Sequence, residues 1–443
     1  MAYFSYGGDK MRFSIDTLGC KVNTYESNVI IDLFESHGYE QVKENADVAI
    51  INTCTVTNTA DRKSVKMIHQ AVRRNPDAIV VVVGCLTQVK SDMVRRIDGV
   101  DIVLGNIGKS KILDYVEQYR RQPRQIVDVP SIENVPFETM ALRHFNRTRA
   151  FVKIQDGCNN FCSYCIIPYT RGNVRSKQPL DVLREIDTLV ADGHQEIVLT
   201  GIHTGHYGTE LDDYHFSDLL RDILTKTDVK RLRISSIEMN EITDEVLHLM
   251  EKYPVLVDHM HIPLQSGSDA ILKKMNRKYD KKEFIDKIDA IKKVRPEMSI
   301  TTDVIVGFPG ETEVEFEETI ETIKRIGFTK IHVFPYSRRE GTPADLMEQV
   351  DDKIKKERVH RLMAISKELE QAYMHRFLNR EIEWIPEMLK GDTLIGHTGN
   401  YLLIKAKGDA SLLHQSIKST ITEVTDTCCL ARIDTEEYSR SLC

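Results

Sequence analysis

The stretch Cys158-Asn159-Asn160-Phe161-Cys162-Ser163-Tyr164-Cys165 carries three cysteines in the spacing C-x-x-x-C-x-x-C. Thiolates select soft metal centres such as iron–sulfur clusters, zinc or cuprous copper. A cubane cluster takes four ligands, whereas this loop offers three, and the next cysteine along the chain is Cys428. One iron would keep an exchangeable position, as a catalytic zinc does. A structural zinc site is the alternative, but no second cysteine pair or matched histidines follow at the spacing that zinc usually takes.

Composition describes a globular chain that buries a core. The 443 residues are 41% hydrophobic and 29% charged, which fits about two to four domains. No apolar run approaches the roughly 18 residues of a membrane span, and the N-terminus lacks the apolar segment of a secretion signal. We therefore expect a cytoplasmic protein without membrane contact. Nine cysteines in such a chain favour metal ligands over disulfides.

The net charge of −7 gives no overall signal for nucleic-acid binding. Any contact with RNA must come from local basic patches. One candidate patch is the helix expected at 58–74, which carries Arg62, Lys63, Lys66, Arg73 and Arg74. A solvated helix face is the favoured interpretation, and a phosphate-binding edge is the alternative.

An N-terminal domain over 11–121 alternates strands with helices, which predicts a doubly wound parallel sheet. The expected strands lie at 12–18, 47–52, 78–83 and 101–104, and the expected helices at 23–37, 58–74, 91–97 and 109–120. A linker rich in proline follows at 122–147.

Three cysteines of this domain each follow a predicted strand: Cys20, Cys54 and Cys85. In open α/β sheets, ligands bind outside the carboxyl ends of the strands. Adjacent parallel strands would bring the three sulfurs to one edge, and Gly19 and Gly84 would let the backbone approach a bulky inorganic core. Three scattered buried thiols are the alternative. We interpret the trio as a second cluster site.

A second repeating pattern runs over 148–375. Six strands are expected at 151–155, 196–200, 231–235, 258–262, 299–304 and 330–333, with helices at 181–191, 216–224, 241–250, 281–294 and 312–326. Six strands fit an open parallel partial barrel, (βα)6, better than a closed eight-fold one. A long charged helix at 353–377 leads out of this core.

The segment 376–443 contains short β-type stretches at 381–386, 401–405, 416–424 and 429–433. These predict a small five-stranded β-barrel. Its cysteines, Cys428, Cys429 and Cys443, lack ligand spacing. Acidic residues outnumber basic ones here, so RNA affinity would rest on Lys390, Lys405, Lys407 and Lys418 or on another part of the chain.

The three strand-end cysteines and the cysteine loop together resemble the radical S-adenosylmethionine (SAM) methylthiotransferases. The resemblance rests on Gly19-Cys20-Lys21-Val22-Asn23-Thr24-Tyr25-Glu26-Ser27, Asn52-Thr53-Cys54 and Gly84-Cys85. The form G-C-K-V-N-x-Y-E is most similar to the branch that acts on N6-threonylcarbamoyladenosine in tRNA. The branches that act on isopentenyladenosine in tRNA and on a ribosomal-protein aspartate tend to D-S-E.

The resemblance implies an N-terminal methylthiotransferase domain, a radical-SAM core and a TRAM-like barrel that grips tRNA. It implies two [4Fe-4S] clusters, one on Cys20, Cys54 and Cys85 and one on Cys158, Cys162 and Cys165. One SAM would be the methyl donor and a second the source of a deoxyadenosyl radical, which removes hydrogen from carbon 2 of the adenine. The implied partners are the tRNA anticodon stem-loop and an electron donor such as flavodoxin or ferredoxin, and the protein would be a monomer. A metal-bound RNA-binding protein without catalysis is the alternative of a different class.

The resemblance also implies SAM contacts, for which ordinary structural roles remain open. Tyr164 would lie beside the adenine or simply pack on the loop. Arg171, which is not among the expected SAM contacts, would pair with a carboxylate or phosphate or brace the loop. The full set of expected contacts is Tyr164, Thr200, Gly201, Ser235, Glu238, Gln265, Arg277 and Asp303.

Four histidines, His203, His206, His259 and His261, raise the question of a further metal. No cysteine or carboxylate accompanies them at ligand spacing. Hydrogen-bonded histidines are therefore the favoured interpretation.

Overall fold

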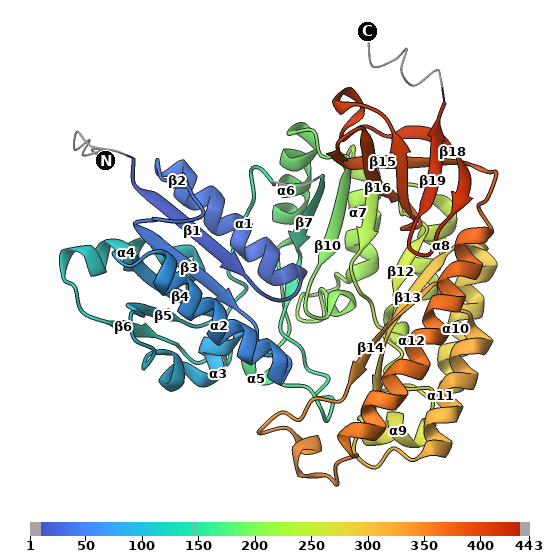
Figure 1. Ribbon diagram of the computed structural model, residues 1–443, viewed down its shortest axis with the longest axis horizontal. Coiled ribbons are helices and arrows are strands. Elements are labelled where there is room, and N and C mark those ends of the chain that lie inside the picture. Colours follow the sequence, from blue (N-terminus) through green and yellow to red (C-terminus); the bar gives the residue numbers. More distant parts are fainter. Residues whose placement is uncertain (1–9, 146–147, 435–443) are drawn as a thin grey trace. The chain divides into compact units, whose positions relative to one another are not determined.

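The structure, a computed structural model, describes residues 10–145 and 148–434 (Figure 1). Its contacts divide the chain into two compact units. Unit 1 holds the described residues up to His144 together with 156–159 and 165–177, and unit 2 holds the remainder. The cysteine loop therefore contributes residues to both units.

A six-stranded parallel sheet with the order β2-β1-β3-β4-β5-β6 forms the centre of unit 1. The central strand β3 is buried along its whole length, as expected of a parallel strand covered on both faces. The strands are β1 (Arg12–Thr17), β2 (Glu40–Gln41), β3 (Val48–Thr53), β4 (Ile79–Gly84), β5 (Ile102–Leu104) and β6 (Ile126–Asp128).

Helices cover both faces of this sheet. The first pair, α1 (Lys21–Ser36) and α4 (Ile112–Arg121), packs its apolar residues on one face. The second pair, α2 (Asn58–Arg74) and α3 (Cys85–Val94), packs on the other face. The predicted doubly wound sheet is confirmed.

One helix of unit 1 was predicted at the wrong position, and two of its strands were not predicted. A helix was expected at 91–97, but α3 begins at Cys85, directly after Gly84, and is kinked at Lys90. The missed strands, β2 and β6, are two and three residues long. Strands this short pair through tertiary contacts and carry no periodic pattern.

Unit 2 contains six parallel strands in two runs, β11-β10-β7 and β12-β13-β14. A parallel bridge between Leu232 and Leu256 links the two runs. The predicted open partial barrel is confirmed. The strands are β7 (Arg149–Lys153), β10 (Glu196–Thr200), β11 (Arg231–Ile234), β12 (His259–His261), β13 (Ser299–Val306) and β14 (Lys330–Pro335).

Helices follow the strands of unit 2 along the chain. They are α6 (Pro179–Ala191), α7 (Phe216–Lys226), α8 (Asp244–Lys252), α9 (Asp269–Lys274), α10 (Lys281–Val294), α11 (Glu313–Ile326) and the long α12 (Asp352–His375). The short elements β8 (Gln155–Asp156), α5 (Ile167–Arg171) and β9 (Arg175–Ser176) flank the cysteine loop. Within the described residues, no helix is both long and apolar enough to cross a membrane.

The C-terminal strands close into a barrel with the order β15-β16-β17-β19-β18, as predicted. Trp384 is fully buried in its core and donates a hydrogen bond to Ser419 Oγ at 2.8 Å. The strands are β15 (Glu381–Lys390), β16 (Thr393–Thr398), β17 (Leu403–Lys407), β18 (Ile417–Val424) and β19 (Cys429–Ile433).

The barrel packs against the amino ends of the partial-barrel strands. Tyr401, held at a φ of 71°, stacks on His259 with 4.8 Å between ring centroids. The guanidinium groups of Arg149 and Arg233 lie 5.0 and 4.7 Å from the Tyr401 ring. Arg149 also pairs with Glu387 of β15 at 3.0 Å. The barrel therefore covers the amino edge and leaves the carboxyl ends of these strands for chemistry.

A buried ion pair ties α12 to the loop that precedes α11. Arg358 Nη1 lies 2.7 Å from Glu311 Oε2, and both side chains are almost fully buried. Removing one partner of a buried pair leaves an uncompensated charge. We expect Arg358→Met to lower the free energy of unfolding, measured by urea denaturation at about pH 8, by about 3 to 5 kcal/mol.

The matched control is Arg361→Met on the same helix, because Arg361 is one-third exposed and pairs with half-exposed glutamates. Its cost should stay below about 1 kcal/mol. Burial raises the pKa of Glu311 to about 7, so at about pH 5.5 the carboxyl is largely protonated and needs no counter-charge. The cost of Arg358→Met should then shrink, and equal costs at both pH values would contradict this account.

Candidate active site

Three cysteines of unit 1 stand at the carboxyl ends of three neighbouring strands, as predicted. Cys20 precedes α1 after β1, Cys54 follows β3, and Cys85 follows β4 as the first residue of α3. The strands β1, β3 and β4 are adjacent in the sheet. Burial raises the pKa of the Cys54 thiol to about 11, and the charges of Cys85 and Cys20 raise it as well. The three thiols are thus near enough to act on one another.

The two glycines beside these cysteines are held at positive φ, 132° for Gly19 and 110° for Gly84. A Cβ on Gly84 would lie 2.6 Å from the carbonyl oxygen of Thr53, and one on Gly19 would lie 2.6 Å from the side chain of Asn23. The structure therefore shows that these glycines allow neighbouring protein segments to approach closely. The expected approach of the backbone to an inorganic core stays a prediction.

A network of buried polar side chains lies next to the trio. Arg171 Nη1 lies 2.5 Å from Glu26 Oε1, and Arg171 Nη2 donates to Asn23 Oδ1 at 2.7 Å. Glu26 pairs in addition with Lys109, and both are almost completely shielded from water. Asn106 donates to the carbonyl of Thr170 at 2.7 Å and lies 3.6 Å from the Cys85 sulfur. Arg171 thus braces its loop against α1.

The cysteine loop is fixed by backbone contacts in each unit. In unit 1, the Cys158 N–H donates to the Gly172 carbonyl at 3.0 Å. In unit 2, the Ser163 N–H donates to the Met275 carbonyl, and the Ser163 carbonyl accepts from the Ala344 N–H at 2.8 Å. Cys162 Sγ accepts a hydrogen bond from Arg277 Nη1 at 3.5 Å.

A polar pocket of unit 2 opens beside Cys162. Arg277 forms an ion pair with Glu238, and its Nε donates to Tyr279 Oη at 3.1 Å. Charges of both signs in one pocket suit a zwitterionic ligand. The lining residues are Asn160, Cys162, His206, Glu238, Asn240, Glu241, Asn276, Arg277, Lys278 and Tyr279.

Two of the expected SAM contacts, Glu238 and Arg277, line this pocket, and the other six do not. Thr200 and Ser235 lie together at the ends of β10 and β11, with 3.3 Å between their hydroxyl oxygens. Gly201 lies close to Gln155. These positions bring polar groups to the carboxyl ends of the strands, as expected.

The remaining expected contacts have partners within unit 2. Tyr164 packs edge-on against Phe308, with 6.4 Å between centroids. Asp303 Oδ2 lies 3.2 Å from His261 Nε2. The backbone of Gln265 bridges to the chain around Val304.

Glu241 is a pocket residue that sequence reasoning missed. Its Oε1 faces the Nε2 atoms of both His203 and His206, with 3.3 Å to His206. The two imidazole rings are stacked, with 3.7 Å between centroids and 25° between planes. The ligand atoms of His203, His206 and Glu241 all lie within 4.8 Å of one another, so the three groups are close enough to share a metal ion. The hydrogen-bonded roles expected for these histidines stay a prediction, and Glu241 is a carboxylate that the sequence did not place beside them.

Burial sets the protonation of His203 and Glu241. It lowers the pKa of His203 to about 4 and raises the pKa of Glu241 to about 7. The His203 imidazole is therefore neutral near pH 7, and the Glu241 carboxyl exchanges its proton in that range.

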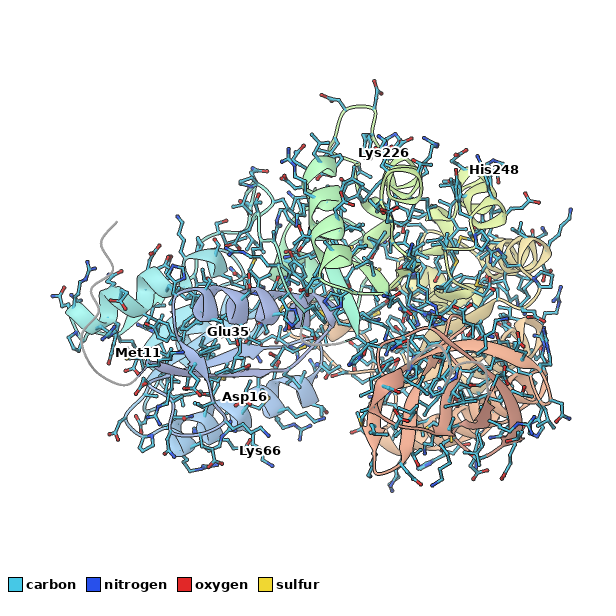
Figure 2. All side chains as sticks on the ribbon, turned by 90° about the horizontal axis from the view of Figure 1, so that it is seen from above. Met11, Asp16, Glu35, Lys66, Lys226 and His248 are labelled. Atoms are coloured by element: carbon cyan, nitrogen blue, oxygen red, sulfur yellow. The ribbon has the colours of Figure 1, made fainter. Side chains whose placement is uncertain are left out.

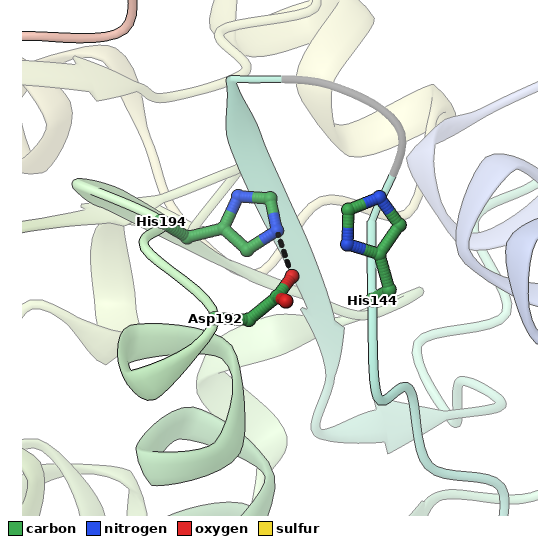
Figure 3. Close-up of side chains that lie close together, drawn as sticks. All are labelled: His144, Asp192 and His194. Carbon is green, nitrogen blue, oxygen red and sulfur yellow. Dashed lines mark ion pairs between the residues drawn. The ribbon is translucent and has the colours of Figure 1, made fainter.

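Asp192 and His194 form a separate pair, with 3.5 Å between Oδ2 and Nε2 (Figure 3). They precede β10 and so lie at the amino end of the strands. That position separates them from the pocket, whose residues follow the carboxyl ends.

Comparison with known proteins agrees with this architecture. Residues 152–323 match the Radical SAM superfamily, and residues 12–105 match the uncharacterized protein family UPF0004. The chain is 47% identical, over 91% of its length and 92% of the relative's, to the threonylcarbamoyladenosine tRNA methylthiotransferase MtaB of Bacillus subtilis. It is 34% identical, over 94% of its length and 83% of the relative's, to the tRNA-2-methylthio-N(6)-dimethylallyladenosine synthase of Oceanobacillus iheyensis.

Among solved structures, the radical SAM methyltransferase TsrM from Kitasatospora setae is similar in fold. The TM-score is 0.56 at 14% identity, over 76% of this chain and 74% of that one. Taken together with the relatives, these matches show that the chain belongs to the radical-SAM methylthiotransferase family. As a member, it uses SAM and two [4Fe-4S] clusters.

The Arg171–Glu26 contact gives a direct test of the buried network. Arg171→Met leaves Glu26 without its bidentate partner and should lower the free energy of unfolding by about 3 kcal/mol. Arg171→Lys keeps the charge but loses the planar fork, so its cost should be intermediate. The control is Arg120→Met, which removes a half-exposed pair with Glu117 and should cost less than about 1 kcal/mol. If Arg171→Met is as mild as the control, the network does not hold the loop.

Proposed function

We propose that this protein inserts a methylthio group at carbon 2 of N6-threonylcarbamoyladenosine next to the anticodon of tRNA. The observation that carries the proposal is the 47% identity, over nine-tenths of both chains, to the relative named for that activity. Relatives named for the dimethylallyladenosine reaction match at 34%, and the sequence G-C-K-V-N-x-Y-E after β1 supports the same choice.

The thiol trios supply suitable ligands for the two clusters. Cys20, Cys54 and Cys85 would hold one cluster, and Cys158, Cys162 and Cys165 the other. In support, the first three stand at adjacent strand ends with Cys54 and Cys85 buried, and three thiolates leave one iron open. When bound, the clusters and SAM supply the electron, the radical, the sulfur and the methyl group that the reaction needs.

The chain's own residues would bind and position the reactants. Arg277 and Glu238 lie beside Cys162 with opposite charges, and they would hold the carboxylate and amino groups of SAM. Carbon 2 carries no acidic proton, so acid–base side chains offer little to the main step. The anticodon loop is single-stranded, which allows a protein to draw out one base.

Several finer features remain part of this proposal. The protein would act in the cytoplasm as a monomer and take electrons from a donor such as flavodoxin or ferredoxin. The expected contacts of Tyr164, Thr200, Gly201, Ser235, Gln265 and Asp303 with SAM belong here as well.

The division of labour between the two trios can be tested with one cysteine variant. Cys54→Ala, after anaerobic reconstitution, should hold about four irons per chain where the unaltered protein holds about eight. It should still cleave SAM to deoxyadenosine but insert no sulfur. Cys428→Ala, in the barrel, is the control and should retain both activities. Full product formation by Cys54→Ala would refute the role of the first trio.

The substrate is tested by mass spectrometry of tRNA nucleosides from a strain that lacks this protein. N6-threonylcarbamoyladenosine without the methylthio group should accumulate, and the unaltered gene should restore the product. Loss of the methylthio group from isopentenyladenosine would point to that substrate instead. If the tRNA nucleosides are unchanged and the ribosomal-protein aspartate lacks its methylthio group, the substrate is that aspartate.

A further inference from the structure

The outer face of α2 carries a line of cationic side chains. Arg62, Lys66 and Arg73 are all exposed, and their spacing of four and seven residues places them on one side of the helix. The opposite side, with Ser64, Ile68 and Ala71, is buried against the sheet. Lys66 extends outward from α2, away from the sheet (Figure 2). At 1.5 Å per residue, the line from Arg62 to Arg73 is about 16 Å long.

These cations are free of carboxylate partners within the part of the chain that the structure describes. Among the described residues, no hydrogen bond or ion pair engages the side chains of Arg62, Lys66 or Arg73. The one acidic residue of α2, Asp61, is already paired with Lys90 at 2.9 Å. Exposed cations on other helices often have a nearby carboxylate, as Arg221 of α7 has Glu245 at 2.7 Å. A line of unpaired positive charges on one helix face is typical of a surface that binds a phosphate backbone.

The line begins close to the thiol trio. α2 starts four residues after Cys54, so Arg62 lies at the helix end that shares the sheet edge with Cys54 and Cys85. Arg73 lies at the far end of the helix. A nucleic acid that brings a base to this edge would have its adjoining backbone within reach of α2.

The C-terminal barrel has fewer unpaired lysines than its sequence suggests. Lys418 pairs with Glu381 at 2.9 Å, and Lys407 pairs with Asp392 at 2.5 Å. Two of the four lysines considered for RNA binding are therefore neutralised by neighbours.

We propose that the outer face of α2, defined by Arg62, Lys66 and Arg73, binds the phosphate backbone of the tRNA stem next to the modified base. This inference rests on the proposed function, because it presumes a tRNA substrate. Contacts with phosphates carry no sequence information and fix orientation. The face would orient the tRNA. The choice of base would rest with the pocket beside Cys162 and with the sheet edge that carries Cys20, Cys54 and Cys85.

The test removes three charges and follows the salt dependence of tRNA binding. The variant Arg62→Gln/Lys66→Gln/Arg73→Gln is compared with Lys293→Gln/Lys353→Gln/Lys356→Gln, which removes three exposed lysines from α10 and α12. Both are reconstituted with iron and sulfide, and binding to unmethylthiolated tRNA is measured between about 50 and 200 mM salt. Loss of three phosphate contacts should flatten the log–log slope by about 2 to 3 and weaken binding about 10- to 100-fold at about 150 mM salt.

The α2 variant should raise the KM for tRNA and leave SAM cleavage without tRNA unchanged, and the control should match the unaltered protein in both. An α2 variant with unaltered affinity and slope would overturn the inference while leaving the proposed function standing. Equal losses in the two variants would overturn it too, because the effect would then be one of net charge.

If the α2 variant binds tRNA normally but cleaves SAM slowly with flavodoxin and normally with dithionite, the face binds an acidic protein and the inference fails. Failure of the unaltered protein to modify tRNA would instead refute the proposed function.

Discussion

The contact between Arg171 and Glu26 is the interaction on which unit 1 depends. The two side chains are almost completely shielded from water, and a buried charge is costly unless it has partners. Asn23 and Asp156 are further partners of Arg171, and Lys109 is a further partner of Glu26, whereas Arg171 Nε has none among the described residues. Through the Arg171–Glu26 contact the segment after the cysteine loop is joined to α1, which begins directly after Cys20, the first cysteine of the other trio. Cys158 and Cys165 therefore belong to the same compact unit as Cys20, Cys54 and Cys85.

Much of this arrangement was predictable because parallel sheets obey simple geometry. The apolar run Ile79–Gly84 and the periodic pattern of α2 identify their elements directly. Once the strands are known to be parallel, cysteines far apart in the sequence must meet at one edge. The placement of Cys20, Cys54 and Cys85 followed from that rule alone.

The features that sequence missed are those set by distant partners. Glu241 lies 38 residues beyond His203 along the chain, and no local pattern joins them. Glu26 and Arg171 are separated by 145 residues. The start of α3 was placed too late because Gly84, at positive φ, begins the helix without a capping side chain. In the first two cases the decisive contact is tertiary, and local propensity carries no trace of it.

The contacts of Tyr401 have a consequence for any chain that lacks the C-terminal barrel. Arg149, Arg231 and Arg233 stand at the amino edge of the partial barrel, and the C-terminal barrel supplies their cover through Tyr401, Glu383 and Glu387. A chain that ended at residue 380 would lack the cover from Tyr401, Glu383 and Glu387, whereas Arg233 would keep its ion pair with Glu196 at 2.6 Å. The barrel therefore acts as an electrostatic cap on Arg149 and Arg231, because truncation before β15 would remove their carboxylate partners Glu387 and Glu383.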